Sequence, residues 1–225
     1  MFVTPEPRRR TKDRLVAAAT ELFAEHGFHG TTMRDIAECA GANLAAVNYH
    51  YGSKKALYLE VMRVQFAHVR AELRRRGAAP PKTELARLAA PQLVDVLRSR
   101  LRVFLDVLIG PPPSVHGTLM QREMCDPSEA LPDIVREFVA PMVAEMTQIV
   151  AQLAPHLDRE TAERCANSIT GQALFYRFTM PAMLHMKSLR AYPPRLAGRL
   201  AEHITEFSLG GLHRLGVRRP RRRHA

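Results

Sequence analysis

Residues 31–54 contain the pattern that most limits how this chain can fold, because helix start, stop and turn residues stand there at close spacing. Thr32 is a good N-cap, and Asp35 three residues later can complete a capping box. Gly41 tolerates the positive φ that ends a helix, and Asn43 offers a new N-cap. Between these signals, apolar residues recur at helical spacing: Met33, Ile36, Ala37 and Ala40. The pattern predicts two short helices that meet in a tight turn.

The second predicted helix, residues 44–51, has two unlike faces. Val47 and Tyr51 lie one turn apart and can face inward. On the other side, Asn48 can read a base edge or hold a phosphate, and Tyr49 can donate its hydroxyl to a phosphate. This layout is typical of a DNA-binding helix-turn-helix whose second helix lies in a major groove. The residues expected to contact DNA are Thr32, Arg34, Asn43, Leu44, Ala45, Asn48, Tyr49 and Lys54.

A third helix is expected to begin after Gly52. Ser53 can cap it, and its first turn carries Lys54 and Lys55, so that free amides, the positive end of the helix and a lysine predict a phosphate clamp. Apolar residues then continue the helical spacing: Leu57, Val61, Val64, Val69 and Leu73. This long helix is expected to link the DNA-binding domain to the rest of the chain.

Residues 11–58 closely resemble the N-terminal domain of the TetR family of one-component transcriptional regulators. The matching positions agree in order and spacing; they are Leu15, Ala18, Ala19, Leu22, Phe23, Gly27, Phe28, Thr31, Thr32, Ile36, Ala37, Ala40, Gly41, Tyr51, Gly52, Ser53 and Lys54. The family usually has an aromatic residue at the position of Asn48 and histidine or a similar residue at that of Tyr49. The resemblance therefore implies an altered base preference with DNA binding retained. A second stretch, residues 120–141, resembles the regulatory domain of the CecR-type subgroup, which implies a helical effector-binding and dimerising domain.

Further apolar stripes at helical spacing predict an all-α fold. They lie within residues 91–109, 134–153, 158–176 and 196–212. Pro91 suits a first helical turn and Asp158 a cap, whereas Gly110 and the prolines after it end a helix. The expected domains are an N-terminal helix-turn-helix domain of three helices at 8–56, a C-terminal helical ligand-binding and dimerisation bundle at 57–214, and a disordered basic tail at 215–225.

Positive charge is concentrated at the two ends of the chain. Of the formal net charge of +11, residues 1–76 carry +5, residues 77–213 carry zero and residues 214–225 carry +6. The first excess suits the neutralisation of phosphates, and a solvated basic face is the alternative. The tail can bind nucleic acid or a membrane surface, but it is short and contains no aromatic residue, so an inert solubilising segment is expected.

Neither a membrane segment nor a reactive thiol is expected. No apolar run approaches the roughly 18 residues of a membrane helix, and the N-terminus lacks the apolar core of a signal peptide, which favours a soluble, cytoplasmic protein. Cys39, Cys125 and Cys165 are far apart and lack metal-ligand spacing. Buried, reduced thiols are expected, with a redox sensor at Cys125 as the alternative.

Dimerisation is expected because one helix-turn-helix reads only a few base pairs, whereas two related by symmetry read a palindrome. The family resemblance implies an interface made by the last two helices, here about residues 158–179 and 194–213. Small residues there permit close helix contact: Ser168, Gly171, Ala173 and Ala201. The alternative is that these residues pack within one subunit.

The bundle is expected to hold a small-molecule effector in an adaptable apolar pocket with polar anchors. The expected effector-binding residues are Phe104, Met120, Arg122, Glu123, Met124, Phe138, Met142, Tyr176 and Arg177. Ordinary core packing is the alternative for the aromatic residues and methionines. The three charged residues become stronger candidates if they are buried, because buried charges need partners.

These observations predict a dimeric, sequence-specific transcriptional regulator, most simply a repressor released from a palindromic operator by an effector. Activation in place of repression and less specific binding of nucleic acid are the alternatives. The chain has no nucleophile elbow, phosphate-binding glycine loop or paired-histidine motif, so no enzyme activity, cofactor or metal is expected.

Overall fold

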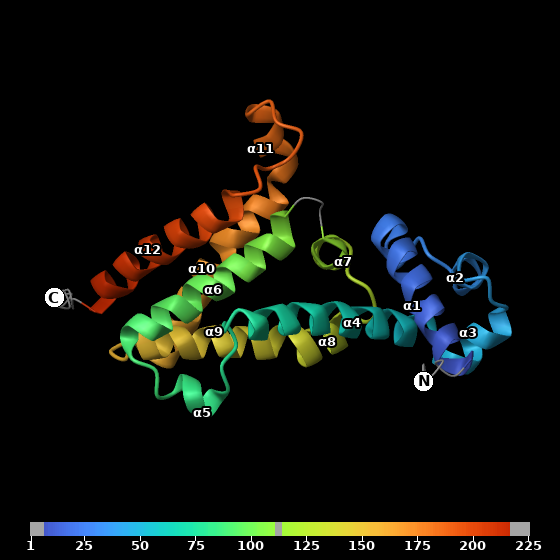
Figure 1. Ribbon diagram of the computed structural model, residues 1–225, viewed down its shortest axis with the longest axis horizontal. Helices are drawn as coiled ribbons and strands as arrows, with labels where there is room; N and C mark the ends of the chain where they lie inside the picture. Colours follow the sequence, from blue (N-terminus) through green and yellow to red (C-terminus); the bar gives the residue numbers. More distant parts are fainter. Residues whose placement is uncertain (1–6, 111–113, 217–225) are drawn as a thin grey trace, which may run out of the picture. The chain divides into compact units, whose positions relative to one another are not determined.

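The computed structural model describes residues 7–110 and 114–216, and the regular structure within these ranges is helical throughout (Figure 1). The predicted all-α fold is confirmed. The chain forms two compact units. The first comprises Met1–His68 with Pro113–Val139, and the second comprises Val69–Pro112 with Ala140–Ala225. Helix α4 (Lys54–Arg75) contributes to both units.

The first unit combines the helix-turn-helix with a later segment of the chain. Its elements are α1 (Pro7–His26), α2 (Met33–Cys39), α3 (Leu44–Tyr51), the start of α4, α7 (Val115–Cys125), α8 (Leu131–Ile134) and the π-helix η1 (Val135–Val139). The later segment was expected in the regulatory bundle. It packs here because α7 contacts α1, and because Lys55 pairs with Asp133 at 2.8 Å and Arg63 with Glu137 at 3.3 Å.

Three aromatic rings form the centre of the first unit. Phe23 and Tyr58 meet edge to face with their ring centroids 4.8 Å apart, and Phe28 lies 5.1 Å from Tyr58. Aliphatic side chains from α1 to α4 surround these rings and are fully buried: Leu15, Ile36, Val47, Leu57, Val61 and Met62. The helices are therefore held together mainly by burial of apolar surface, at about 25 cal/mol per Å².

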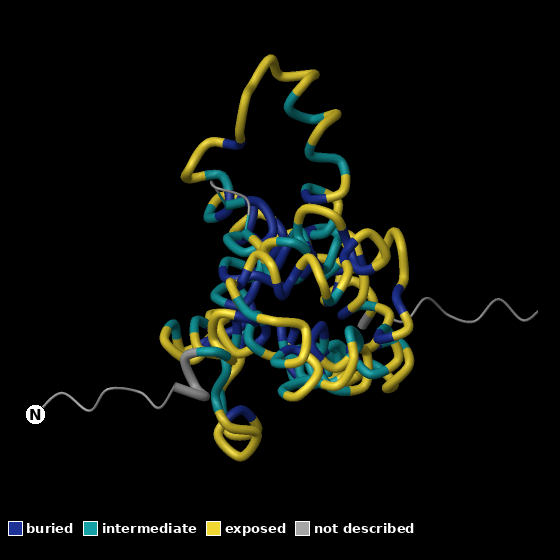
Figure 2. The backbone as a smooth tube through the Cα atoms, turned by 90° about the vertical axis from the view of Figure 1, so that its right-hand side faces the viewer, coloured by how far each residue is buried: buried dark blue, intermediate teal, exposed yellow. Residues whose placement is uncertain are grey.

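The second unit is a bundle built around α6. Besides the end of α4, its elements are α5 (Lys82–Leu85), α6 (Ala90–Ile109), α9 (Ala140–Leu153), α10 (Arg159–Phe178), α11 (Met180–Met186) and α12 (Leu196–Gly216). Helix α6 packs against α9, α10 and α12 and buries Leu97, Leu101 and Leu105 completely. By contrast, α11 and the loop after it are mostly exposed (Figure 2).

Two prolines explain where the helices depart from the predicted ranges. The continuous helix expected over 134–153 is divided among α8, η1 and α9. Pro141 has no N–H to donate to the carbonyl of Glu137, four residues earlier, and the wider π-helical turn lies at this position. Pro181 likewise cannot continue α10 and stands in the first turn of α11, a short helix that the sequence did not predict.

Two further properties concern the chain over the ranges that the structure describes. No helix there combines the length and the apolar character needed to cross a membrane. The same residues contain no cluster of three or more histidine, cysteine, aspartate or glutamate side chains suited to a metal ion.

Candidate nucleic-acid interface

The turn between α2 and α3 has the geometry that its sequence predicts. Thr32 Oγ1 accepts a hydrogen bond from the amide of Asp35 at 3.2 Å, and Asp35 Oδ2 accepts one from the amide of Thr32 at 2.9 Å. These bonds form the predicted capping box, and they lower the pKa of Asp35. Gly41 has a φ of 58°, and Asn43 Oδ1 accepts from the amide of Ala46 at 2.7 Å. Both ends of the turn are thus set by local hydrogen bonds.

Helix α3 presents one buried and one exposed face, as predicted. Val47 is completely buried, whereas the Tyr49 side chain is 70% exposed. Seven of the eight residues expected to contact DNA are exposed; they are Thr32, Arg34, Asn43, Leu44, Ala45, Asn48 and Tyr49. A capped turn therefore carries a helix whose outer face combines small, amide and phenolic side chains.

Two contacts from α1 hold this helix pair, and neither was predicted. Arg14 Nη2 donates to the carbonyl of Gly41 at 3.1 Å, and the Tyr51 hydroxyl donates to the carbonyl of Lys12 at 3.5 Å. Burial raises the pKa of Tyr51 to about 12. The partners lie far apart in the sequence, so no local pattern could have identified these contacts.

Lys54, which is expected to bind a phosphate, makes several contacts within the protein. Its Nζ donates to the carbonyls of Phe28 at 2.9 Å and Thr31 at 3.1 Å, and it lies 4.3 Å from the centroid of the Phe28 ring. The neighbouring Lys55 pairs with Asp133. Only the cap matches the prediction for this turn: Ser53 Oγ accepts from the amide of Ala56 at 3.1 Å. Lys54 is thus engaged within the first unit, and its contact with DNA stays a prediction.

Arg122, expected to anchor an effector, instead caps a helix of the first unit. Its Nε donates to the carbonyl of Ala24 at 2.8 Å, and its Nη2 donates to that of Glu25 at 2.5 Å. These carbonyls belong to the last turn of α1, where a cation also interacts favourably with the helix dipole. The Arg122 side chain is exposed, and both carbonyls engage its guanidinium group.

Glu123 is also engaged within the first unit. Its side chain is 1% exposed and accepts hydrogen bonds from the Tyr58 hydroxyl at 3.0 Å, from the Ser128 amide at 3.1 Å and from the Ser128 hydroxyl at 3.0 Å. Burial and the nearby carboxylate raise the pKa of Tyr58. Three donors compensate the buried carboxylate and fasten the loop after α7 to α4.

The remaining expected effector residues do not gather in one site within either unit. Met120, Met124 and Phe138 belong to the first unit, where Phe138 stacks on Phe66 with centroids 4.6 Å apart. In the second unit, Phe104 and Tyr176 pack against the core, and Arg177 Nη1 donates to the carbonyl of Leu108 at 3.3 Å. Burial lowers the pKa of Arg177. Met142 does line a cavity of the second unit.

The cysteines differ from the expectation of burial. Cys39 and Cys125 are exposed, Cys165 is partly buried, and all three are free thiols. Helix α2 buries Ile36 and Ala37, which places Cys39 on its solvent side. Burial raises the pKa of the Cys165 thiol. The expected basic tail at 215–225 lies outside the described residues from position 217 onward.

A capped helix-turn-helix with an exposed second helix, followed by a helical bundle, defines a DNA-binding transcriptional regulator. Residues 15–61 match the family described as "Bacterial regulatory proteins, tetR family". Residues 93–212, more than half of the chain, match "HTH-type transcriptional dual regulator CecR, C-terminal domain". The chain belongs to the TetR family and carries the CecR-type C-terminal domain. The TetR family is a non-enzymatic family of transcriptional regulators.

Individual relatives agree with this assignment. The HTH-type transcriptional dual regulator CecR of Shigella flexneri is 28% identical over 149 residues, which are 63% of this chain and 64% of the relative. The HTH-type transcriptional regulator RutR of Escherichia coli K12 is 42% identical over 52 residues, 23% of this chain and 24% of the relative. The chain thus spans less than two thirds of the length of these curated relatives.

A solved structure shows the same fold. The putative transcriptional regulator from Pseudomonas aeruginosa PAO1 aligns with a TM-score of 0.67 and 21% sequence identity. The alignment covers 95% of each chain.

Proposed function

We propose that the protein is a homodimeric repressor that binds a palindromic operator and leaves it when a small molecule binds the helical bundle. The observation that carries this proposal is the exposed face of α3 on its capped turn. There, Asn48, Tyr49 and Ala45 are exposed. In the proposed complex Asn48 hydrogen-bonds a base edge or a phosphate, Tyr49 donates to a phosphate, and Ala45 permits close approach to the groove. Such a regulator acts where the DNA is, in the cytoplasm of a bacterium.

An exposed apolar surface on α10 and α12 supports the dimer. Phe175 and Phe178 of α10 are 50% and 42% exposed, and Phe207 and Leu215 of α12 are 67% and 55% exposed. Helices α10 and α12 are neighbours, and Gln172 donates to Ser208 between them at 3.3 Å. Apolar groups of this size on adjacent helices favour burial against a second copy.

The small residues expected at this interface fall into two groups. Ala173 and Ala201 are buried in the core of their own unit, so for these two the alternative of packing within one subunit holds. Ser168 and Gly171 are exposed, and a Cβ added at Gly171 would meet no atom within 4 Å. Gly171 therefore leaves room for a partner helix to approach α10 closely.

Activation is the second candidate, because the Shigella flexneri relative is described as a dual regulator. The same dimer and the same recognition helix serve either outcome, which depends on where the operator lies relative to the promoter. Binding through charge alone is a weaker candidate, because it needs no capped recognition helix.

The test is selection of the purified protein against random duplex DNA at physiological salt, followed by sequencing of the bound fraction. We expect a palindromic motif with half-sites about one helical turn apart. Asn48→Ala should change the preferred bases, and Tyr49→Ala should weaken binding to all sequences. Retention of all sequences alike would contradict the proposal and favour binding through charge alone.

A further inference from the structure

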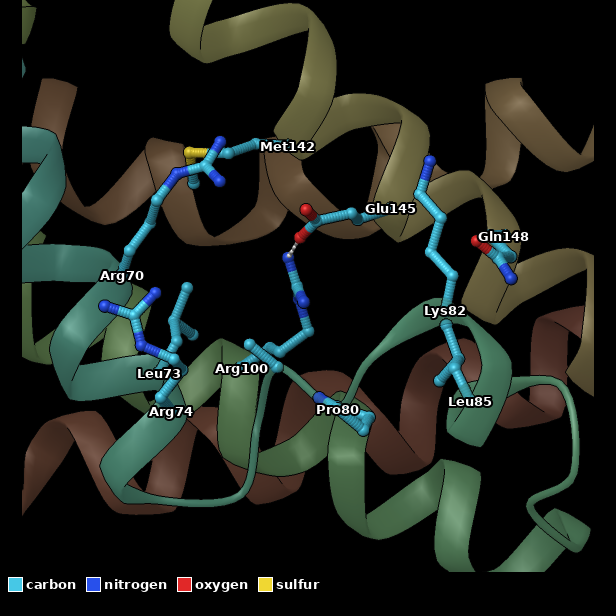
Figure 3. A pocket seen from close by; sticks show the side chains of 11 residues that line it. Arg70, Leu73, Arg74, Pro80, Lys82, Leu85, Arg100, Met142, Glu145 and Gln148 are labelled. Atoms are coloured by element: carbon cyan, nitrogen blue, oxygen red, sulfur yellow. Dashed lines mark hydrogen bonds and ion pairs between the residues drawn. The ribbon is translucent and has the colours of Figure 1, made fainter.

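A cavity of about 150 Å³ lies within the second unit, among the last turns of α4, the short helix α5, α6 and α9 (Figure 3). Part of its wall is apolar and consists of Leu73, Ala79, Pro80, Leu85 and Met142. An engineered apolar cavity of about 150 Å³ in another protein holds benzene. The space therefore suits a molecule the size of a single ring.

The charged part of the wall is strongly basic. It contains Arg70, Arg74, Lys82 and Arg100 against the single carboxylate of Glu145. In Figure 3, Arg70 and Arg74 lie on one side of the ion pair between Arg100 and Glu145, and Lys82 lies on the other. The wall thus combines an apolar surface with an excess of positive charge.

Only one of these cations is neutralised by a protein group. Arg100 is 7% exposed; its Nη2 lies 2.7 Å from Glu145 Oε2, and its Nη1 donates to the carbonyl of Ala78 at 3.1 Å. No salt bridge within the described residues includes Arg70, Arg74 or Lys82, whereas their neighbours Arg75 and Arg76 pair with Glu72. Three cations therefore face the cavity without a carboxylate partner.

The C-terminal carbonyls of α4 are capped, which limits their repulsion of an anion in the cavity. Carbonyls at a helix C-terminus disfavour negative charge. Here the carbonyl of Leu73 accepts from the amide of Ala78 at 2.8 Å, and that of Arg74 accepts from the amide of Gly77 at 3.0 Å. Gly77 has a φ of 64°, which permits this capping turn. The last-turn carbonyls of Leu73 and Arg74 thus already have hydrogen-bond donors.

We infer that this cavity binds a small organic carboxylate. Its apolar part contacts Leu73, Leu85 and Met142, and its carboxylate is held at the rim by Arg70, Arg74 and Lys82 through charge-assisted hydrogen bonds. That this ligand is the effector rests on the proposed function, but binding itself does not. Arg100 and Glu145 form the floor of the site, and the Glu145 carboxylate repels the ligand.

The test uses benzoate and its neutral isostere benzamide, titrated calorimetrically into the full-length protein in the absence of DNA. We expect saturable binding of benzoate and at least about tenfold weaker binding of benzamide, because charged hydrogen bonds contribute roughly that factor. Equal affinities for the two molecules, or no benzoate binding at millimolar concentration, would overturn the inference. Inorganic phosphate is a third probe, and binding of phosphate tighter than benzoate would also contradict an organic ligand.

Variants locate the site. Arg70→Gln with Arg74→Gln should weaken benzoate binding about tenfold or more, whereas the control Arg87→Gln, on an exposed residue outside the cavity, should not. Glu145→Gln should strengthen binding, because it removes the repelling charge and keeps an acceptor for Arg100. Unchanged affinity in both the double variant and Glu145→Gln would place the ligand elsewhere and refute the site.

A separate measurement asks whether this site controls DNA binding. We expect saturating benzoate to weaken binding of the selected operator by the full-length protein. Benzoate binding without any change in operator affinity would confirm the cavity as a carboxylate site and exclude it as the effector site. Failure to select an operator would instead contradict the proposed function and leave the calorimetric result standing.

Discussion

At the scale of single residues, several long charged side chains form hydrogen bonds with groups that are distant in the sequence. The carbonyls that bind Lys54 belong to residues 26 and 23 positions earlier. Arg122 bonds carbonyls 98 and 97 positions away, and Glu123 accepts from Tyr58 across 65 positions. Sequence spacing identified these residues as chemically important, but it did not identify the partners that their charges have within the protein. A flexible side chain takes whichever partner the tertiary fold brings within reach.

Replacement of Lys54 should separate stability from DNA binding. Lys54→Met removes two charge-assisted hydrogen bonds, so we expect a loss of about 1–3 kcal/mol in the free energy of unfolding, measured with urea. Because two backbone carbonyls hold the ammonium, we expect the slope that relates operator affinity to salt concentration to stay unchanged. The matched variant Arg34→Met should leave stability nearly unchanged and reduce the slope by about one phosphate contact. If Lys54→Met instead reduced the salt slope and left stability unchanged, Lys54 would be a phosphate contact.

His116 should make the protein less stable in acid. Burial lowers its pKa from 6.5 to about 4, and its Nδ1 has no hydrogen-bond partner among the described residues. Since the unfolded chain binds a proton at His116 more readily, the stabilisation is complete above about pH 6.5 and is lost as the pH falls toward 4. We expect His116→Leu to reduce this acid destabilisation by about 3 kcal/mol.

The measurement is urea unfolding of both proteins between pH 4 and pH 7. A constant difference in stability across this range would show that His116 does not titrate as described. His68 is exposed, so His68→Leu serves as the control for the replacement of a histidine by leucine.

At the scale of elements, capping residues in the sequence predicted several helix starts correctly. The capping box of α2, the Asn43 cap of α3 and the Asp158 cap of α10 all form as predicted. Each involves atoms within three residues, so tertiary contacts do not compete with it. The helix interruptions at Pro141 and Pro181 also have a local cause. The apolar pattern continues across both prolines, so it did not indicate these interruptions.

The effect of a substitution at Gly41, in the turn between α2 and α3, should depend on the backbone conformation there and not on the room for a side chain. Gly41 has a φ of 58°, yet nothing lies within 4 Å of an added Cβ. Gly41→Ala should therefore cost about 1–2 kcal/mol of unfolding free energy, and Gly41→Asn should cost less because asparagine tolerates this conformation. Equal unfolding midpoints for the two variants in urea would contradict this explanation.

At the scale of the whole molecule, the compact units do not follow the linear order of the chain. The segment 113–139 separates two parts of the second unit in sequence but packs with the helix-turn-helix. It is held there by Arg122, by Glu123 and by the ion pairs of Lys55 and Arg63. A segment within the CecR-type domain thus belongs structurally to the DNA-binding unit, which was not evident from its apolar pattern.

The proposed dimer predicts the effect of a charge on α12. Phe207→Glu should raise the dimer dissociation constant by at least about tenfold and abolish tight operator binding, because the exposed ring would otherwise be buried against a partner. Met186→Glu, the same kind of change on α11 at a side chain that is 77% exposed, is the control. Sedimentation and operator titration measure both effects. If Phe207→Glu had the same dimer dissociation constant as the control, the interface would not include this part of α12.

The all-α class, the caps, the turn at Gly41 and the two faces of α3 can be predicted from the amino-acid sequence, because they depend on interactions between residues only a few positions apart. The partners of Lys54, Arg122 and Glu123, and the assembly of a basic cavity from four separate helices, are known only from the folded structure. Charges and apolar side chains interact according to their distance in space. Side chains far apart in the chain become neighbours only when the helices pack.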